Sequence, residues 1–383
     1  MHWGVWAMRF KYIDASRGMA VLLAMISHAF IQFTGGIEIP IEADVLRLIV
    51  TRTATPTFLV LFGIMIEVAY FRPLREGRPF QSVAHRLMSR SLTCYLLFVA
   101  ITAAAFLTDK LSALDALGAV TFTAGGRFGV ILKLYAVLFV VIALTLRPGV
   151  RWGAPFYAGI ALIAWATKYL FEATGWSAPY LVQSQLGPGE GFGPATFLGL
   201  TLVAFGMLIG EALTGRRAWW PVAIAVCMAC IGLVFGMADY GLKQFALNMV
   251  ASFRWVNSPY YYVFGVCAAS ISLAVFWMLS TRGPNALTYP LGELGKDTLF
   301  VYGFGNILIN LLPLYRGTDV VTGFALLCAF MVFLVLLSFQ RSRISRAIDP
   351  EGSGLLSQIQ KAYEAFLNGT SDKLTRSYAE RRN

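Results

Sequence analysis

The sequence predicts an all-α, polytopic integral membrane protein with about ten transmembrane helices. Of its 383 residues, 57% are apolar and only 13% are charged, whereas a soluble domain carries about 25% charged residues. Many of the apolar stretches approach the ~20 residues that a helix needs to cross a bilayer. These stretches are continuous rather than alternating in polarity, which argues against transmembrane strands.

Ten predicted spans follow one another along the chain, and short polar loops separate them. They cover residues 12–33, 50–70, 87–107, 127–146, 153–171, 194–213, 219–237, 260–280, 297–314 and 318–339. The weakly apolar segment 110–124 is predicted to form a short re-entrant piece. The prediction is one membrane domain, 1–345, followed by a tail, 346–383, that lies as an amphipathic helix on the cytoplasmic surface.

The loops alternate in charge along the chain. Arginines concentrate in 71–90, 147–151, 214–218 and 340–346, whereas acidic residues occur in 34–46 and 172–193. Because cytoplasmic loops carry the excess of Lys and Arg, both termini and the arginine loops are predicted to be cytoplasmic. An even number of spans agrees with that placement. The net charge of +11 arises mainly in these short loops, so it does not suggest a nucleic-acid partner.

The cysteines do not have the pattern of a metal site. All five lie inside apolar runs, and no histidine or acidic residue lies near Cys227 and Cys230, which share a helix face. We therefore expect the cysteines to be packing residues and expect no bound metal.

The stretch RGMAVLLAMISH, residues 17–28 of the first predicted span, begins with Arg17 and ends with His28. Eleven residues make almost three helical turns, so both side chains point the same way, roughly 16 Å apart along the axis. Asp14, one turn earlier, is placed to hold the Arg17 guanidinium. An ionisable group inside a span is costly and faces a cavity or a partner. One interpretation is that Arg17 reaches the interface and His28 bonds a neighbouring helix; the other is that both line a channel.

Such a channel suits a long substrate whose anionic head stays at the cytoplasmic surface, and acyl-coenzyme A is such a molecule. A neutral imidazole can take the proton from a hydroxyl that attacks the thioester. The guanidinium groups of the arginines in segment 71–90 are well shaped to bind the donor's phosphates. The alternative is that these arginines only set the membrane topology and contact lipid headgroups. Lys133 either lines this cavity or extends to the interface. The candidate donor-binding residues are Arg72, Arg75, Arg86, Arg90 and Lys133.

Aromatic residues at the outer ends of spans suggest an acceptor site. Trp255 and Tyr260 lie in such a region, where aromatic rings usually form the interfacial belt but can also stack on a sugar. Glu190, in the glycine-rich segment 187–194, is a further acceptor-site candidate.

Several stretches resemble a known enzyme superfamily. Asp14-Ala15-Ser16-Arg17-Gly18 followed by His28 resembles the D-x-x-R-G start and R-x10-H spacing of the acyltransferase 3 superfamily. Segments 56–72, 85–96, 131–148 and 294–305 are similar to segments of the OpgC-type glucan succinyltransferase branch. The sequence departs from the pattern at Lys133, where the glucan enzymes tend to have proline. Many superfamily members have a histidine just after the late tyrosine, but Tyr302 is followed by Gly-Phe-Gly-Asn.

The resemblance implies an O-acyltransferase of the bacterial inner (plasma) membrane that has no permanently bound cofactor. It would move an acetyl or succinyl group from cytoplasmic acetyl-CoA or succinyl-CoA to a hydroxyl of an extracytoplasmic glycan or glycolipid. His28 would be the catalytic base, and Arg17 and Asp14 would complete the catalytic set. Arg17 would bind the donor's phosphates together with the arginines of 72–90, and Tyr302 would lie on the acceptor side. The alternative is a transporter or flippase for an anionic or lipid-linked substrate, although no inverted repeat is visible. The deep His28 argues against a non-catalytic scaffold, and the oligomeric state stays open.

Overall fold

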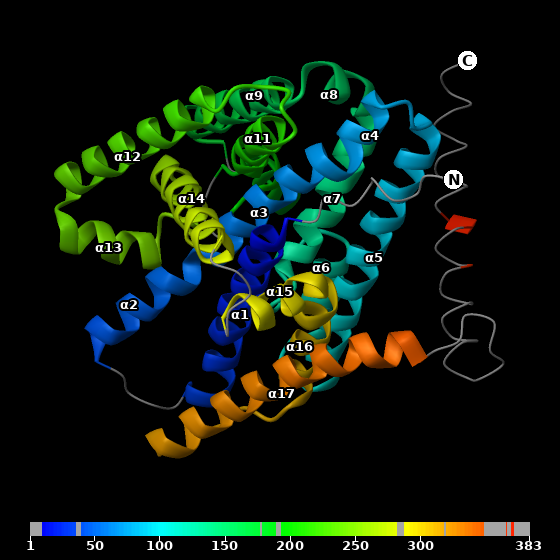
Figure 1. The fold of residues 1–383 in the computed structure, drawn as a ribbon. Helices are drawn as coiled ribbons and strands as arrows, with labels where there is room; N and C mark the ends of the chain where they lie inside the picture. The colour runs from blue at the N-terminus through cyan, green and yellow to red at the C-terminus, as the bar shows by residue number, and fades with distance from the viewer. Residues whose placement is uncertain are drawn as a thin grey trace.

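The computed structural model describes residues 10–35, 40–176, 178–188, 193–281, 287–317 and 319–347, together with 365, 369 and 370. Every element in these ranges is helical (Figure 1). The first half of the chain forms α1 (Lys11–Thr34), α2 (Ile41–Arg52), α3 (Ala54–Met65), the π-helix η1 (Ile66–Phe71), α4 (Arg72–Arg75), α5 (Phe80–Leu107), α6 (Ala113–Val120), α7 (Val130–Leu144), α8 (Leu146–Trp152) and α9 (Ala154–Ala173).

The second half continues the bundle. It forms α10 (Tyr180–Leu186), α11 (Thr196–Leu213), α12 (Trp220–Tyr240), α13 (Leu242–Ala251), α14 (Pro259–Thr281), α15 (Thr288–Lys296), α16 (Thr298–Leu311) and α17 (Val320–Ala347).

The predicted all-α, polytopic class is confirmed. Among the described residues, seven segments are long and apolar enough to cross a membrane. They are α1, the continuous segment Ile41–Arg75, α5, α11, α12, α14 and the part Val320–Arg341 of α17. The helices α7 and α8, bent by 80°, make an eighth if they count as one span.

Two of the ten predicted spans do not meet this test. The predicted span 153–171 is α9, and 297–314 is α16, which has only 14 residues. Since a helix needs ~20 residues to cross a bilayer, α16 is too short to span alone. The re-entrant segment expected at 110–124 contains the short helix α6. Most of the predicted tail, 346–383, lies outside the described residues, so its amphipathic helix stays a prediction.

Helix α1 lies in the middle of the bundle, against α3, α14, α15, α16 and α17 (Figure 1). Its contact with α15 is made between backbones. A Cβ added at Gly18 would lie 1.9 Å from the carbonyl oxygen of Leu291, and one at Gly295 would lie 1.7 Å from that of Asp14. Small residues allow such close approach between membrane helices. Glycine at both positions therefore places α15, and the start of α16, beside Asp14 and Arg17.

A second glycine seam joins α3 to α11. A Cβ at Gly63 would lie 2.0 Å from the Val203 carbonyl oxygen, and one at Gly206 would lie 1.9 Å from that of Val60. Directly after α3, the chain widens into the π-helix η1, a rare form that often occurs at functional sites. The seam and η1 together bring Glu67 to the end of α11.

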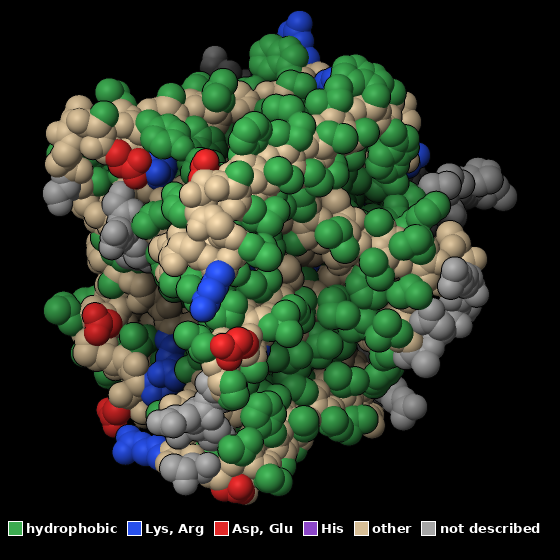
Figure 2. Space-filling view, turned by 90° about the vertical axis from the view of Figure 1, so that its left-hand side faces the viewer, with side chains coloured by type: hydrophobic (Ala, Val, Ile, Leu, Met, Phe, Trp, Pro, Cys, Tyr) green, Lys and Arg blue, Asp and Glu red, His purple; other side chains and the backbone are tan. Residues whose placement is uncertain are grey.

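Apolar side chains dominate one broad face of the molecule. Figure 2 shows many hydrophobic side chains on this face, densest on its right half, with the charged side chains mainly on its left half. Helix α12 exposes Met228, Val234 and Phe235 at 62–64% of their surface. So much exposed apolar surface is unusual for a soluble protein and agrees with contact to lipid tails.

Candidate active site

His28 is held by a defined hydrogen bond from another helix. Its Nδ1 lies 2.7 Å from Oδ1 of the buried Asn306 on α16. The amide of Asn306 has only one possible orientation, because its Nδ2 donates to the Tyr302 carbonyl oxygen at 2.7 Å and a carbonyl can only accept. Oδ1 therefore accepts from His28 Nδ1–H. The lone pair of the neutral imidazole is then on Nε2, the form that a general base needs.

The ring of His28 is also packed between aromatic groups. It stacks on Phe128 with centroids 4.4 Å apart, and Tyr302 meets it edge-on at 5.9 Å. The Tyr302 hydroxyl donates to the Phe128 carbonyl oxygen at 2.6 Å. Phe128 has φ 59°, a left-handed conformation that bulky residues rarely adopt and that is concentrated at functional sites. These contacts orient the imidazole from two sides.

Arg17, on α1, contacts a residue at the start of α16, the helix that carries Asn306. Its Nη2 donates to the Thr298 hydroxyl at 3.0 Å, and its Nη1 lies 3.8 Å from Oδ1 of Asp14. The predicted contact between Asp14 and Arg17 is therefore present. Helix α16 joins the two ends of the stripe on α1, since Thr298 meets Arg17 and Asn306 meets His28.

Tyr135 lies near a group at each end of this stripe, Arg17 and the Tyr302 that contacts His28. Its hydroxyl donates to the Phe58 carbonyl oxygen at 2.7 Å, and both Arg17 and Tyr302 lie within electrostatic range of it. Its ring stacks on Phe62 with centroids 4.9 Å apart.

The arginines of segment 71–90 do not form one group. Arg75 pairs with the buried Glu67, and Arg72 pairs with Glu76 at 2.8 Å. By contrast, Arg86 lies 5.4 Å from the Tyr70 ring, and Arg90 hydrogen-bonds the side chain of the same tyrosine. The charge of Arg75 is therefore balanced by a carboxylate inside the protein, and the expectation that Arg72 and Arg75 bind a donor stays a prediction.

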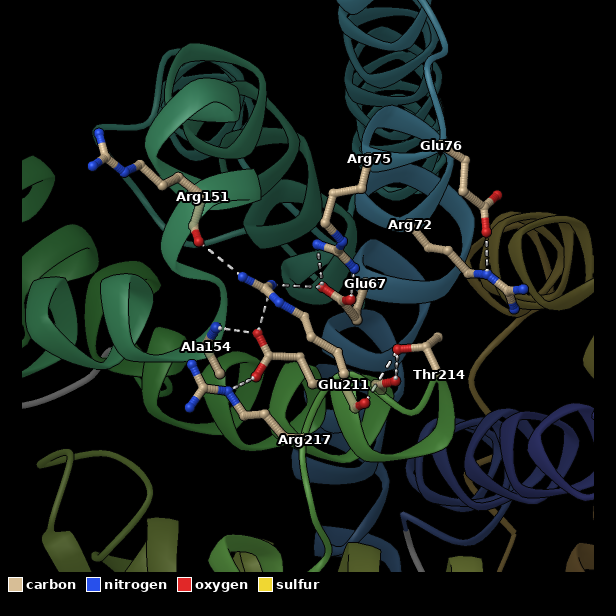
Figure 3. Close-up of polar contacts among 11 residues, drawn as sticks. Glu67, Arg72, Arg75, Glu76, Arg151, Ala154, Glu211, Thr214 and Arg217 are labelled. Atoms are coloured by element: carbon tan, nitrogen blue, oxygen red, sulfur yellow. Dashed lines mark hydrogen bonds and ion pairs between the residues drawn. The ribbon is translucent and has the colours of Figure 1, made fainter.

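A buried ion cluster, which the sequence analysis missed, takes up Arg75. Glu67 and Glu211 are both fully buried, and Arg216 lies between them, 3.0 Å from Glu211 and 3.9 Å from Glu67 (Figure 3). Arg217 also pairs with Glu211, whose Oε1 accepts from the Ala154 N–H at 3.1 Å. The cluster therefore joins η1, α11 and the start of α9. Two acids inside apolar runs, each followed by arginines, were the signal in the sequence.

Lys133 does not join the arginines. It lies at the start of α7, where its Nζ donates to the Ala124 carbonyl oxygen at 3.3 Å and approaches the ring of Phe98. Phe98 is eight residues after Arg90 on α5, which corresponds to roughly 12 Å along the helix. Helix α7 thus places the lysine beside Phe98, about two turns from Arg90 along α5, and its grouping with the phosphate-binding arginines stays a prediction.

Lys133 instead lines a cavity of about 140 Å³, together with Arg254, Tyr180 and Trp255. Of the predicted acceptor residues, Trp255 lines this cavity and Tyr302 contacts His28. Tyr260 lies elsewhere, since its hydroxyl donates to the exposed Asp239 at 2.9 Å. Glu190 lies outside the described residues.

Cations gather beyond His28, toward the end of α1. Arg52, Arg127 and Arg254 all lie within electrostatic range of His28. One turn after His28, Gln32 accepts from Lys110 Nζ and Arg127 Nη2, both at 3.4 Å. Burial, with a smaller contribution from Arg127, lowers the pKa of Lys110 to about 8. At pH 7 this side of the site is therefore strongly positive.

One comparison with known proteins gives a match. Residues 9–195 match the family model of the heparan-alpha-glucosaminide N-acetyltransferase catalytic domain. This match supports a membrane acyltransferase. The matched segment contains Arg17, His28 and Lys133, whereas Asn306 and Arg254 lie beyond it. The search for similar curated proteins found no match, and the glucan succinyltransferase branch stays a prediction.

Proposed function

We propose that the protein transfers an acyl group from cytoplasmic acyl-CoA to a sugar on the opposite side of the membrane. The observation that carries the proposal is His28, whose Nδ1 is engaged by Asn306 and whose Nε2 is left as the base. It lies on one stripe with Arg17, roughly 16 Å away. That separation places the base and the donor's anionic head at different depths.

The chemistry follows from this arrangement. A hydroxyl or amine of the acceptor attacks the thioester carbonyl carbon while its proton passes to Nε2 of His28. The tetrahedral intermediate then collapses, the carbon–sulfur bond breaks, and the imidazolium returns the proton to the departing thiolate. Asn306 keeps the ring in the tautomer that can accept, and Phe128 and Tyr302 keep it oriented.

The orientation in the membrane belongs to the proposal. The arginine loops, the donor entrance and both termini would be cytoplasmic under the positive-inside rule, in a bacterial inner membrane. The matched family is named for acetyl transfer to an amino sugar, so acetyl-CoA and an amino acceptor are the first pair to test, with succinyl-CoA and a hydroxyl acceptor second.

The direct test is acyl transfer by the purified full-length protein. We expect radiolabelled acetyl-CoA or succinyl-CoA to release free CoA only when a saccharide is added, with the label appearing on glucosamine or on glucose. N-acylated and O-acylated products separate by their stability in mild alkali. In sealed vesicles, uptake of an intact labelled substrate without CoA release would contradict the proposal and support the transporter alternative.

The donor's phosphates are expected to bind Arg86 and Arg90. Both arginines lie beside Tyr70 and are exposed, and one charge-assisted contact contributes about 1–3 kcal/mol. Arg86→Ala should therefore weaken acetyl-CoA binding by roughly 5- to 150-fold in calorimetry. Arg72→Ala is the matched control, because Arg72 belongs to the same loop but already pairs with Glu76. Equal losses in both variants, or no loss in Arg86→Ala, would contradict the assignment.

A further inference from the structure

Two cations line one cavity, and no carboxylate is among the described residues that line it. Lys133 is only 7% exposed, and its hydrogen bond is a long one, 3.3 Å, to the Ala124 carbonyl oxygen. Arg254 donates from Nε to the Gly193 carbonyl oxygen at 2.8 Å. Among the residues that the structure describes, neither forms an ion pair with an acid, and both line the same cavity. An enclosed charge without a counter-ion is costly, so the arrangement favours an anion from outside the chain.

The same cavity presents flat aromatic surfaces. Lys133 Nζ lies 5.3 Å from the centre of the Tyr180 ring, and the Arg254 guanidinium lies 5.3 Å from that of Trp255. Ser184, on the same helix α10 as Tyr180, also lines the cavity and adds a second hydroxyl. Rings with polar tips combine apolar contact with hydrogen bonding. These groups suit a ligand that has both a flat face and polar edges.

The size of the cavity limits the ligand to about one ring. Its volume is about 140 Å³, close to the ~150 Å³ of an engineered protein cavity that holds one benzene molecule. A single six-membered sugar ring is of this order, whereas a longer saccharide would have to extend outside.

The cavity also lies next to the proposed base. Arg254 is within electrostatic range of both His28 and Tyr302. Gly125 and Gly126 line the cavity, and two residues later Phe128 stacks on His28. One short loop therefore separates the two sites.

We infer that this cavity binds one sugar ring that carries a carboxylate or a phosphate, with Lys133 and Arg254 as its anion partners and Tyr180 and Trp255 against the ring. The inference rests on the proposed function, because it assigns the chemical class of the acceptor. An anionic sugar held here would present its neighbouring hydroxyl or amine toward His28.

The test measures saccharide binding without any acyl donor. Calorimetry of the full chain in detergent would compare glucuronic acid, glucose 1-phosphate, glucose and inorganic phosphate. We expect at least one sugar anion to bind ten or more times as tightly as glucose and as inorganic phosphate, and the two sugar anions distinguish a carboxylate from a phosphate site. If glucose binds as tightly as both sugar anions, the charge contributes nothing to binding and the inference is overturned. If inorganic phosphate binds as tightly as both sugar anions, the sugar ring contributes nothing and the inference is likewise overturned.

Variants connect the binding to the two cations. Lys133→Met should lower the affinity for the preferred sugar anion at least tenfold, and Lys133→Arg should retain most of it. Lys168→Met is the matched control, because Lys168 is also buried but pairs with Glu172 at 2.8 Å. The affinity of the Lys168→Met variant for the sugar anion should stay unchanged. If Lys133→Met does not fold, Arg254→Gln makes the same test. Unchanged affinity in a folded Lys133 or Arg254 variant would overturn the inference.

The result can be separated from that of the proposed function. His28→Ala should bind the sugar anion as tightly as the unaltered protein, since His28 does not line the cavity. Binding of the sugar anion without any acyl transfer would support the cavity assignment and contradict the proposed acyltransferase function. Acyl transfer to neutral sugars alone would support the acyltransferase function and contradict the cavity assignment.

Discussion

His28→Gln and His28→Ala are both expected to reduce acyl transfer by about 10²- to 10⁴-fold, the usual loss when a general base is removed. Glutamine can donate to Asn306 Oδ1 as His28 Nδ1 does, so it keeps the contact between α1 and α16. It cannot take a proton from the acceptor. CoA release with radiolabelled acetyl-CoA and a saccharide would give the rates, and equal affinity for acetyl-CoA would show that the variants remain folded.

Asn306→Leu separates orientation from proton transfer. Without Oδ1 the imidazole loses the partner that places its proton on Nδ1, so both tautomers become accessible and the rate should fall less than in His28→Ala.

Transfer should also decline in acid for the unaltered protein, because a protonated imidazole cannot accept a proton. A His28→Gln protein that binds acetyl-CoA and transfers at close to the normal rate would refute the catalytic role and favour the transporter.

Glu211→Gln is expected to destabilise the protein by about 1–3 kcal/mol, the usual cost of leaving charged hydrogen-bonding groups without a partner, because Arg216 and Arg217 are only partly buried, at 23% and 37% exposed. Glu211 is fully buried and balances both Arg216 and Arg217, and its carboxylate also accepts from the Ala154 backbone (Figure 3). The variant would leave three guanidinium groups, those of Arg75, Arg216 and Arg217, with Glu67 as the one remaining carboxylate of the cluster. Chemical or thermal unfolding in detergent would measure the loss.

Glu76→Gln is the matched control for this prediction. Glu76 pairs with Arg72 at 2.8 Å, but their side chains are 36% and 42% exposed. Water screens such a pair, so its removal should change the free energy of unfolding by only about 0–1 kcal/mol. If Glu211→Gln unfolds at the same point as Glu76→Gln, the cluster does not stabilise the junction of η1, α9 and α11.

The sequence alone determined the class of the protein and the stripe on its first helix. Apolar content and run length predict membrane helices because backbone polar groups must be satisfied inside lipid. The alignment of Arg17 with His28 follows from the period of one helix, and Asp14 lies within one turn of Arg17. These are local relationships, and no other part of the chain is needed to derive them.

The partners of that stripe depended on the tertiary structure. Asn306 meets His28 across 278 residues of chain. In the sequence it was visible only as part of the Gly-Phe-Gly-Asn stretch after Tyr302, where many acyltransferase 3 proteins have a histidine. Lys133 and Arg254 share a cavity, and Glu67 and Glu211 share a cluster, because glycine seams and antiparallel helices set which turns meet. Periodicity tells which face of a helix a residue occupies, but it does not tell which helix packs against that face or at what height. Helix packing decides both, and with them which charged side chains lie close enough to pair.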